Sequence, residues 1–155
     1  MSTAGVYTFV FHKKRNYEKN CHLIILLVSI SLAFAYVHPK NADEIVGVYW
    51  SPKKDAKIEI YKRGNHYYGK SIWVASMRKD AKNPDESLKN RDVLGIELLT
   101  GFSFNDNSYT DGKIYDPESG KTYDCKMTLN NKILKVRGYI GISLFGRTET
   151  FEKIN

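Results

Sequence analysis

Short β-strands joined by turns of a few residues are the feature that most constrains the fold of this chain. In the segment AKIEIYK, residues 56–62, Ile58 and Ile60 fall on one face and polar side chains on the other, which is the two-residue period of a half-buried strand. The turn RGN follows at 63–65, and the next strand, HYYGKSIWVA, completes a hairpin over residues 66–75. The same pattern continues along the chain and predicts eight or nine strands, nearly all in antiparallel hairpins.

An antiparallel meander leaves unpaired strand edges unless the sheet closes on itself. We therefore predict an all-β fold, a single antiparallel up-and-down barrel of about eight strands, with an open sandwich as the alternative. The interior of an eight-stranded barrel is either filled by side chains or holds one small ligand. The functional question is therefore what occupies the barrel.

Two polar stretches interrupt the strand pattern. Residues 76–92 contain one predicted helical turn, in which Asn83 is the N-cap and Glu86 stands three residues later. Residues 105–112, NDNSYTDG, are predicted to form a loop before a strand at 113–116. Neither stretch divides the chain into separate domains.

The N-terminal residues are typical of a secretory signal peptide rather than of a folded domain. A basic region is followed by the uncharged apolar run LIILLVSISLAFA, residues 23–35, which ends on the small-x-small pattern Ala33-Phe34-Ala35. The run is shorter than the roughly 20 residues of a membrane-spanning helix. We predict a signal peptide over 1–35, a barrel domain over 36–155, and a periplasmic or secreted protein without a membrane span after cleavage. An uncleaved N-terminal anchor is the alternative.

Charge argues against a nucleic-acid partner. The whole chain has a formal net charge of +7, but residues 1–35 hold four of the 24 basic residues and one of the 17 acidic ones. Their removal leaves a net charge of +4, which is a mildly basic surface rather than a nucleic-acid footprint.

The remaining chain shows no residue pattern typical of a catalytic or metal site. Residues 107–118 lack the oxygen ligands of a calcium loop, and SGKT at 119–122 lacks the first glycine and the helix of a phosphate loop. His38 and His66 have no cysteine or carboxylate set at zinc-ligand spacing. Cys125, the single cysteine after residue 35, is expected to be a buried core residue. We therefore expect no catalytic residues, no metal and no cofactor, in a protein that is not an enzyme.

The segment GVYW, Gly47 to Trp50, resembles the Gly-x-Trp opening of lipocalins, with one extra residue before the tryptophan. In such a barrel a glycine eases the bend of the first strand, and a tryptophan plugs one end beneath an arginine from the last strand. Gly47, Trp50 and Arg147 are the predicted structural plug. The alternative interpretation makes Trp50 an ordinary core residue in phase with Val46 and Val48.

Aromatic and basic side chains are the candidates for ligand contacts. Tyr68 and Trp73 lie on the third predicted strand, and Arg137 and Tyr139 lie on a later one. In the barrel mouth, tyrosines and an arginine would fix a polar head while apolar walls hold the rest of the ligand. The alternative is that Arg137 and Tyr139 lie on the outer face, as strand alternation predicts.

Long blocks of the sequence resemble a family of small exported bacterial proteins that is known as a domain of unknown function. The blocks are GVYW, IEIYKRGNHYYGKSIW, NPDESLKNRDVLGIELLTGF, GKIYDPESGKTYDCKMTL and LKVRGYIGISLFGRT, which together span nearly all of residues 44–155. The resemblance implies a lipocalin-like, calycin-type barrel in the bacterial envelope. It implies no activity and no binding residues.

These observations favour a non-enzymatic binding protein that holds a small apolar ligand in its barrel. An envelope interaction module that binds protein or glycan on its outer surface is the alternative, and a hydrolase or isomerase with an unfamiliar site ranks third. The oligomeric state is left open by the sequence.

Overall fold

The computed structural model describes residues 41–154, which belong to one compact unit, Lys40–Asn155. The predicted signal peptide, residues 1–35, lies outside the described residues, as does the predicted start of the domain at residue 36. No helix within residues 41–154 has the length and apolar character needed to cross a membrane.

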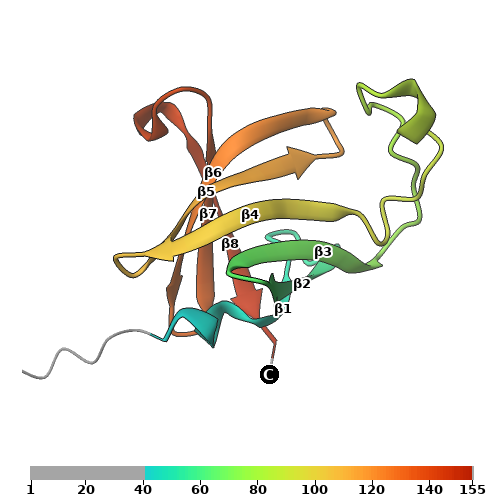
Figure 1. Cartoon of the computed structure of the whole chain (residues 1–155). Coiled ribbons are helices and arrows are strands. Elements are labelled where there is room, and N and C mark those ends of the chain that lie inside the picture. Colours follow the sequence, from blue (N-terminus) through green and yellow to red (C-terminus); the bar gives the residue numbers. More distant parts are fainter. Residues whose placement is uncertain (1–40, 155) are drawn as a thin grey trace, which may run out of the picture. The chain divides into compact units, whose positions relative to one another are not determined.

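Eight antiparallel strands form a closed barrel (Figure 1), in which each strand pairs with the next and the last pairs with the first. The strands are β1 (Gly47–Trp50), β2 (Ala56–Arg63), β3 (His66–Val74), β4 (Glu97–Asn105), β5 (Ser108–Asp116), β6 (Lys121–Asn130), β7 (Ile133–Tyr139) and β8 (Arg147–Lys153). The prediction of an up-and-down barrel is confirmed, and the open sandwich is wrong because β1 and β8 hydrogen-bond to each other.

The two ends of the barrel differ in the lengths of their connections. At one end, which we call the closed end, β2–β3, β4–β5 and β6–β7 are joined by two-residue turns at 64–65, 106–107 and 131–132. The 3₁₀ turn η1 (Ala42–Ile45) leads into β1 at this end. At the other, open end the connections are longer and span 51–55, 75–96, 117–120 and 140–146. They include the short 3₁₀ turns η2 (Glu86–Leu88) and η3 (Ser143–Phe145).

Two local predictions are corrected by the structure. Residues 105–112 are not a loop, because Asp106 and Asn107 both adopt positive φ, 45° and 62°, and so close a tight hairpin that lets β5 start at residue 108. The helical turn in the polar stretch is present as η2, but Asp85 is its N-cap. The Asn83 side chain instead accepts a hydrogen bond from the Asp85 backbone N–H, at 2.9 Å.

The lumen near the closed end is filled by aromatic side chains, among which three tyrosines share one arrangement. Tyr49, Tyr67 and Tyr109 are at most 2% exposed. Each hydroxyl donates a hydrogen bond to η1: Tyr49 to the Ile45 carbonyl at 2.8 Å, Tyr67 to Asp43 Oδ1 at 2.5 Å, and Tyr109 to the Ala42 carbonyl at 2.7 Å. Burial raises the pKa of all three phenols, that of Tyr67 to about 12.

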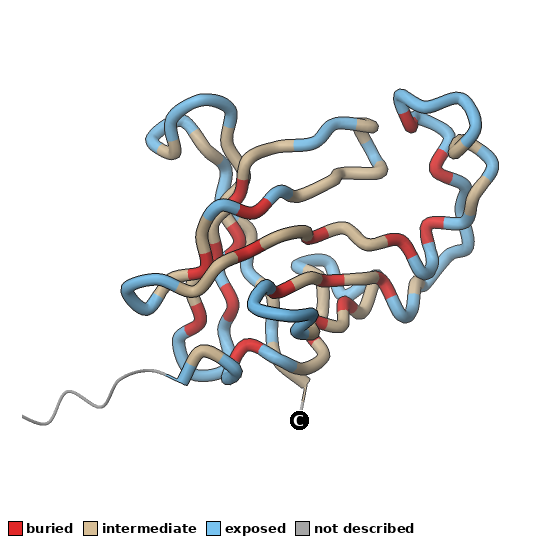
Figure 2. Tube along the Cα trace, viewed as in Figure 1, coloured by how far each residue is buried: buried red, intermediate tan, exposed pale blue. Residues whose placement is uncertain are grey.

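The middle of the lumen is packed by large side chains of β4 that lie over glycines of the neighbouring strands β3 and β5. A Cβ at Gly112 would lie 2.4 Å from the ring of Phe102, and one at Gly69 would lie 2.9 Å from Leu99. Figure 2 shows the buried residues along the strands, while the connections at both ends are mostly exposed. The absent side chains therefore give Phe102 and Leu99 the room to enter the barrel.

Gly112→Ala is expected to lower the free energy of unfolding by about 1 to 3 kcal/mol, because the added methyl overlaps a ring that packing holds in place. Gly138→Ala is the matched control, since a Cβ there meets its nearest neighbour, Ile114, at an ordinary 3.4 Å. The control is expected to cost less than about 1 kcal/mol. Urea unfolding followed by circular dichroism measures both, and equal losses would contradict the packing described here.

Candidate functional site

A cavity of about 650 Å³ occupies the barrel toward its open end. Its walls are apolar and come from five strands: Ile58 of β2, Leu98 and Leu99 of β4, Ile114 of β5, Val136 of β7 and Phe151 of β8. Ile58, Leu99 and Val136 are at most 4% exposed, because strand alternation turns them inward. The barrel interior is thus filled near the closed end and hollow near the open end.

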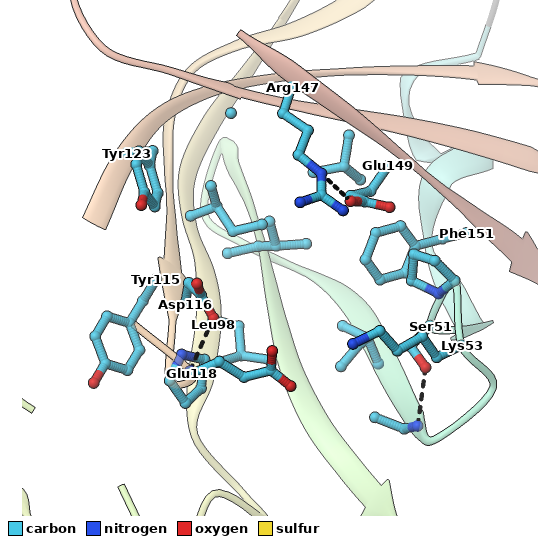
Figure 3. A pocket seen from close by; sticks show the side chains of 18 of the residues that line it. Ser51, Lys53, Leu98, Tyr115, Asp116, Glu118, Tyr123, Arg147, Glu149 and Phe151 are labelled. Carbon is cyan, nitrogen blue, oxygen red and sulfur yellow. Dashed lines mark hydrogen bonds and ion pairs between the residues drawn. The ribbon is translucent and has the colours of Figure 1, made fainter. Parts of the chain in front are cut away.

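The rim of the cavity is polar, and two of its arginines are paired with carboxylates. Arg147 Nε lies 2.6 Å from Glu149 Oε1, and Arg78 Nη1 lies 3.2 Å from Glu118 Oε1. Figure 3 shows Arg147 directed toward Glu149 on one side of the pocket, while Asp116 and Glu118 lie on another side. Three tyrosines, Tyr115, Tyr123 and Tyr139, also line it. The rim therefore offers hydroxyl groups, two ion pairs, and the side chains of Lys53, Asp55 and Asp116.

One wall of the rim is tied to the long connection 75–96 by a buried carboxylate. Asp80 is fully buried and accepts hydrogen bonds from the Tyr115 hydroxyl at 2.6 Å, from Asn83 Nδ2 at 2.7 Å and from Arg91 Nη2 at 2.8 Å. Burial alone would raise the pKa of Asp80, but these three donors outweigh it and hold the pKa below the ordinary value. Asp80 thus fastens the connection to β5 beside the cavity.

Asp80→Asn is expected to lower the free energy of unfolding at neutral pH by about 1 to 3 kcal/mol, because the Arg91 guanidinium loses its buried anionic partner. Since the folded-state pKa is lowered, the carboxylate stabilises the protein above the ordinary value of 3.8. That contribution disappears as the pH falls through the lower folded-state value. The difference between wild type and variant in urea unfolding should therefore shrink as the pH is lowered below about 4.

Asp92→Asn is the control for this prediction, because Asp92 belongs to the same connection and pairs with Lys79 at 2.8 Å on the exposed surface. Exposed pairs of this kind contribute at most about 1 kcal/mol. A loss as large as that of Asp80→Asn, or a difference that does not change with pH, would contradict the role assigned to Asp80.

Of the four predicted ligand contacts, only Tyr139 lines the cavity. Tyr68 lies on the outer wall, where its ring stacks on Tyr61 with centroids 5.9 Å apart and the Arg63 guanidinium lies 3.8 Å from its centroid. Trp73 is 41% exposed and packs edge-on against Trp50. The uneven phase of β3 comes from a bulge against β2, which sequence alternation alone does not place.

Arg137 lies on the outer face and fastens the connection between β7 and β8. Its Nε donates to the Ser143 carbonyl at 2.7 Å, its Nη2 to the Leu144 carbonyl at 3.0 Å, and its Nη1 to Thr148 Oγ1 at 2.8 Å. We call residues 140–146 the apolar loop, because Ile140, Ile142, Leu144 and Phe145 are 60–81% exposed there. Ile140 and Phe145 also line the cavity mouth.

The predicted plug is not assembled as expected, because Trp50 and Arg147 do not meet. Trp50 faces outward, with Lys57 Nζ 4.7 Å from its ring centroid, and the side chain of Arg147 is 86% exposed. The alternative interpretation of Trp50 is also wrong, since Tyr49 rather than Trp50 is buried.

Tyr49 and Lys153 take the places that were assigned to Trp50 and Arg147. Lys153 Nζ lies 5.7 Å from the Tyr49 ring centroid and donates to the Glu44 carbonyl at 2.6 Å. Gly47 opens β1 with a φ of 145°, and a Cβ there would lie 2.7 Å from Lys153 Cε. Position 49, two residues after the glycine, is the tryptophan position of Gly-x-Trp, so the spacing itself pointed to Tyr49.

The described residues contain no group of three or more His, Cys, Asp or Glu side chains arranged to hold a metal ion. Cys125 is fully buried, and burial raises the pKa of its thiol to about 12. A thiol in that state is a core side chain rather than a nucleophile.

A closed eight-stranded up-and-down barrel with a hollow open end is a lipocalin-like fold. The chain belongs to the DUF2147 family, described as an uncharacterized protein conserved in bacteria, whose model matches residues 47–153. No curated protein matches the chain.

A similar solved structure is that of protein HP1028 from the human pathogen Helicobacter pylori, which is described as belonging to the lipocalin family. The two share 24% sequence identity with a TM-score of 0.66, over 72% of this chain and 84% of the other. At this identity the likeness shows the fold alone.

Proposed function

We propose that this protein is a non-enzymatic binding protein that holds one small, largely apolar molecule in the open half of its barrel. The observation that carries the proposal is the cavity of about 650 Å³ between apolar strand residues. Ligand sites in proteins fall between about 300 and 1,000 Å³ and are mostly apolar with a few polar groups. The cavity meets both conditions.

The chemistry of the rim supports a ligand with a neutral polar end. Arg147 and Arg78 are already paired with carboxylates, so neither guanidinium is free to hold an anion without losing its partner. Lys53, the remaining cation of the rim, stands against Asp55 and Asp116, so the rim has no excess of positive charge. The phenol groups of Tyr123 and Tyr139 are uncharged groups there that can donate or accept hydrogen bonds. An uncharged head at the mouth and an apolar body against Leu99 and Val136 fit this arrangement.

The site of action is proposed to be the periplasm or the cell exterior. This rests on the predicted signal peptide at residues 1–35, which precedes the described part of the chain. A carrier of apolar molecules has a plain role there, because such molecules are poorly soluble in the water between or outside membranes.

A second candidate function, binding of protein or glycan on the outer surface, is favoured by an aromatic cluster on the wall formed by β1, β2 and β3. Trp50 and Trp73 pack edge to face with centroids 5.6 Å apart, and Lys57 Nζ lies against both rings. Exposed aromatic faces of this kind are common in recognition surfaces. The cavity makes the first function the better supported one, since a surface module does not need a hollow barrel.

Native mass spectrometry of the protein purified without detergent from the producing cells tests the proposal. A reproducible mass above that of the chain, lost on denaturation, is expected and identifies the ligand. A bare mass, together with failure to take up apolar probes, would overturn the small-molecule function and favour the outer surface.

Ile114→Trp is expected to weaken binding of the uncharged fluorescent probe N-phenyl-1-naphthylamine by about tenfold, because the indole occupies part of the cavity; a tenfold change is about 1.4 kcal/mol. Ile133→Trp is the matched control, since Ile133 is 37% exposed at the far end of the barrel. Both variants keep the apolar loop, so a difference in probe fluorescence reports the cavity. Equal affinities would show that the probe does not bind there.

A further inference from the structure

The apolar loop, residues 140–146, is the largest exposed apolar feature at the open end. Four of its side chains are strongly exposed: Ile140 at 76%, Ile142 at 60%, Leu144 at 75% and Phe145 at 81%. The loop stands away from the strands, and Figure 2 shows its exposed residues. Contiguous exposed apolar side chains of this size mark an interaction site more often than chance.

The loop is built to keep these side chains outward. The guanidinium of Arg137 donates to the carbonyls of Ser143 and Leu144 and so fixes the backbone from beneath. Gly146 allows the close return of the chain, because a Cβ there would lie 2.6 Å from the Gly138 carbonyl oxygen and 2.9 Å from Tyr139 Cβ. These contacts fix the loop backbone in a conformation that leaves the apolar side chains exposed.

Cations surround the base of the loop. No aspartate or glutamate occurs between Lys126 and Thr148. On the outer faces of β5 to β7 nearby, four cations face one carboxylate, a net excess of three positive charges: Lys113, Lys126, Lys135 and Arg137 against Asp124. Asp124 is already paired with Lys113, and Lys126 and Lys135 make no ion pair among the described residues.

We propose that the apolar loop docks the barrel on the surface of an anionic phospholipid bilayer. Side chains that project singly from a short loop can each enter the boundary between head groups and acyl chains, and cations behind them attract the lipid phosphates. A stable protein partner would instead need roughly 800 Å² of complementary surface on each side, which a convex loop of seven residues does not provide.

Docking of this kind brings the cavity to the bilayer, because Ile140 and Phe145 belong both to the loop and to the cavity mouth. An apolar molecule could then pass between bilayer and barrel without crossing water. The docking itself does not depend on the proposed function, since the loop and the cations are present whether or not the cavity holds a ligand.

Vesicle flotation of residues 40–155 tests the inference. This unit contains the closed sheet and the whole described core, and it omits the apolar run 23–35, which would bind lipid by itself. Binding to phosphatidylcholine vesicles that contain phosphatidylglycerol is expected, with weaker binding to phosphatidylcholine alone and weakening by salt. Failure of the folded unit to float with the anionic vesicles overturns the proposal.

Variants separate the two contributions. Leu144→Ser combined with Phe145→Ser is expected to lower vesicle binding by about tenfold or more, because two large apolar groups are removed from the contact. Lys126→Gln combined with Lys135→Gln should remove much of the preference for anionic vesicles and flatten the salt dependence. Ile133→Ser, at the other end of β7, is the matched control and should bind as the wild type does.

Unchanged flotation of the Leu144 and Phe145 variant overturns the docking assignment, because the loop would then not be the contact. Concentration-dependent growth in mass by analytical ultracentrifugation, without vesicle binding, overturns it in favour of self-association. Native mass spectrometry tests for a bound ligand independently of flotation. A negative result in one experiment therefore does not overturn the proposal tested by the other.

Discussion

The hydrogen-bonding demand of three buried phenols governs how this barrel is closed. A tyrosine ring fills the lumen well, but its hydroxyl must find a partner once water is excluded. η1 supplies those partners through two backbone carbonyls and the Asp43 carboxylate. η1 is therefore part of the core, and the barrel is filled at this end and hollow at the other.

Because the closed end is packed, the two ends of the same strands have different roles: one holds the sheet together and the other surrounds the cavity. Two-residue turns at the closed end hold the strand pairs in register, while the longer connections at the open end shape the cavity mouth. Asp80 anchors the connection 75–96 by accepting a hydrogen bond from Tyr115 of β5. Arg137 of β7 anchors the apolar loop by donating to the Ser143 carbonyl. The mouth is thus formed by loops that are tied to the wall.

Strand alternation predicted the barrel and much of its core from the sequence, because inward and outward positions differ in polarity. Ile58 and Ile60 faced inward as expected, and so did Cys125. Alternation fails where the period is broken, as at the bulge in β3 between Ser71 and Trp73, which places Trp73 outside. It also fails where a shift of one residue changes the predicted inward side chain, as in β1, where Tyr49 and not Trp50 is buried.

The cavity was not predictable in the same way, because it exists only where side chains from five different strands do not contact one another across the lumen. No pattern within one strand carries that information, and the roles of Lys153 and Arg137 depend on contacts between β8 and η1 and between β7 and the apolar loop. What the sequence could offer was Gly47 and its two-residue spacing to position 49.

Both tryptophans of the chain, Trp50 and Trp73, lie against each other on the outer wall, with Lys57 over their rings. Neither indole lines the cavity. The tryptophan emission of this protein is therefore expected to be insensitive to what the barrel contains. In a ligand titration, tryptophan fluorescence would not change even when the cavity is fully occupied. An optical assay of occupancy therefore needs a fluorescent ligand or an added label.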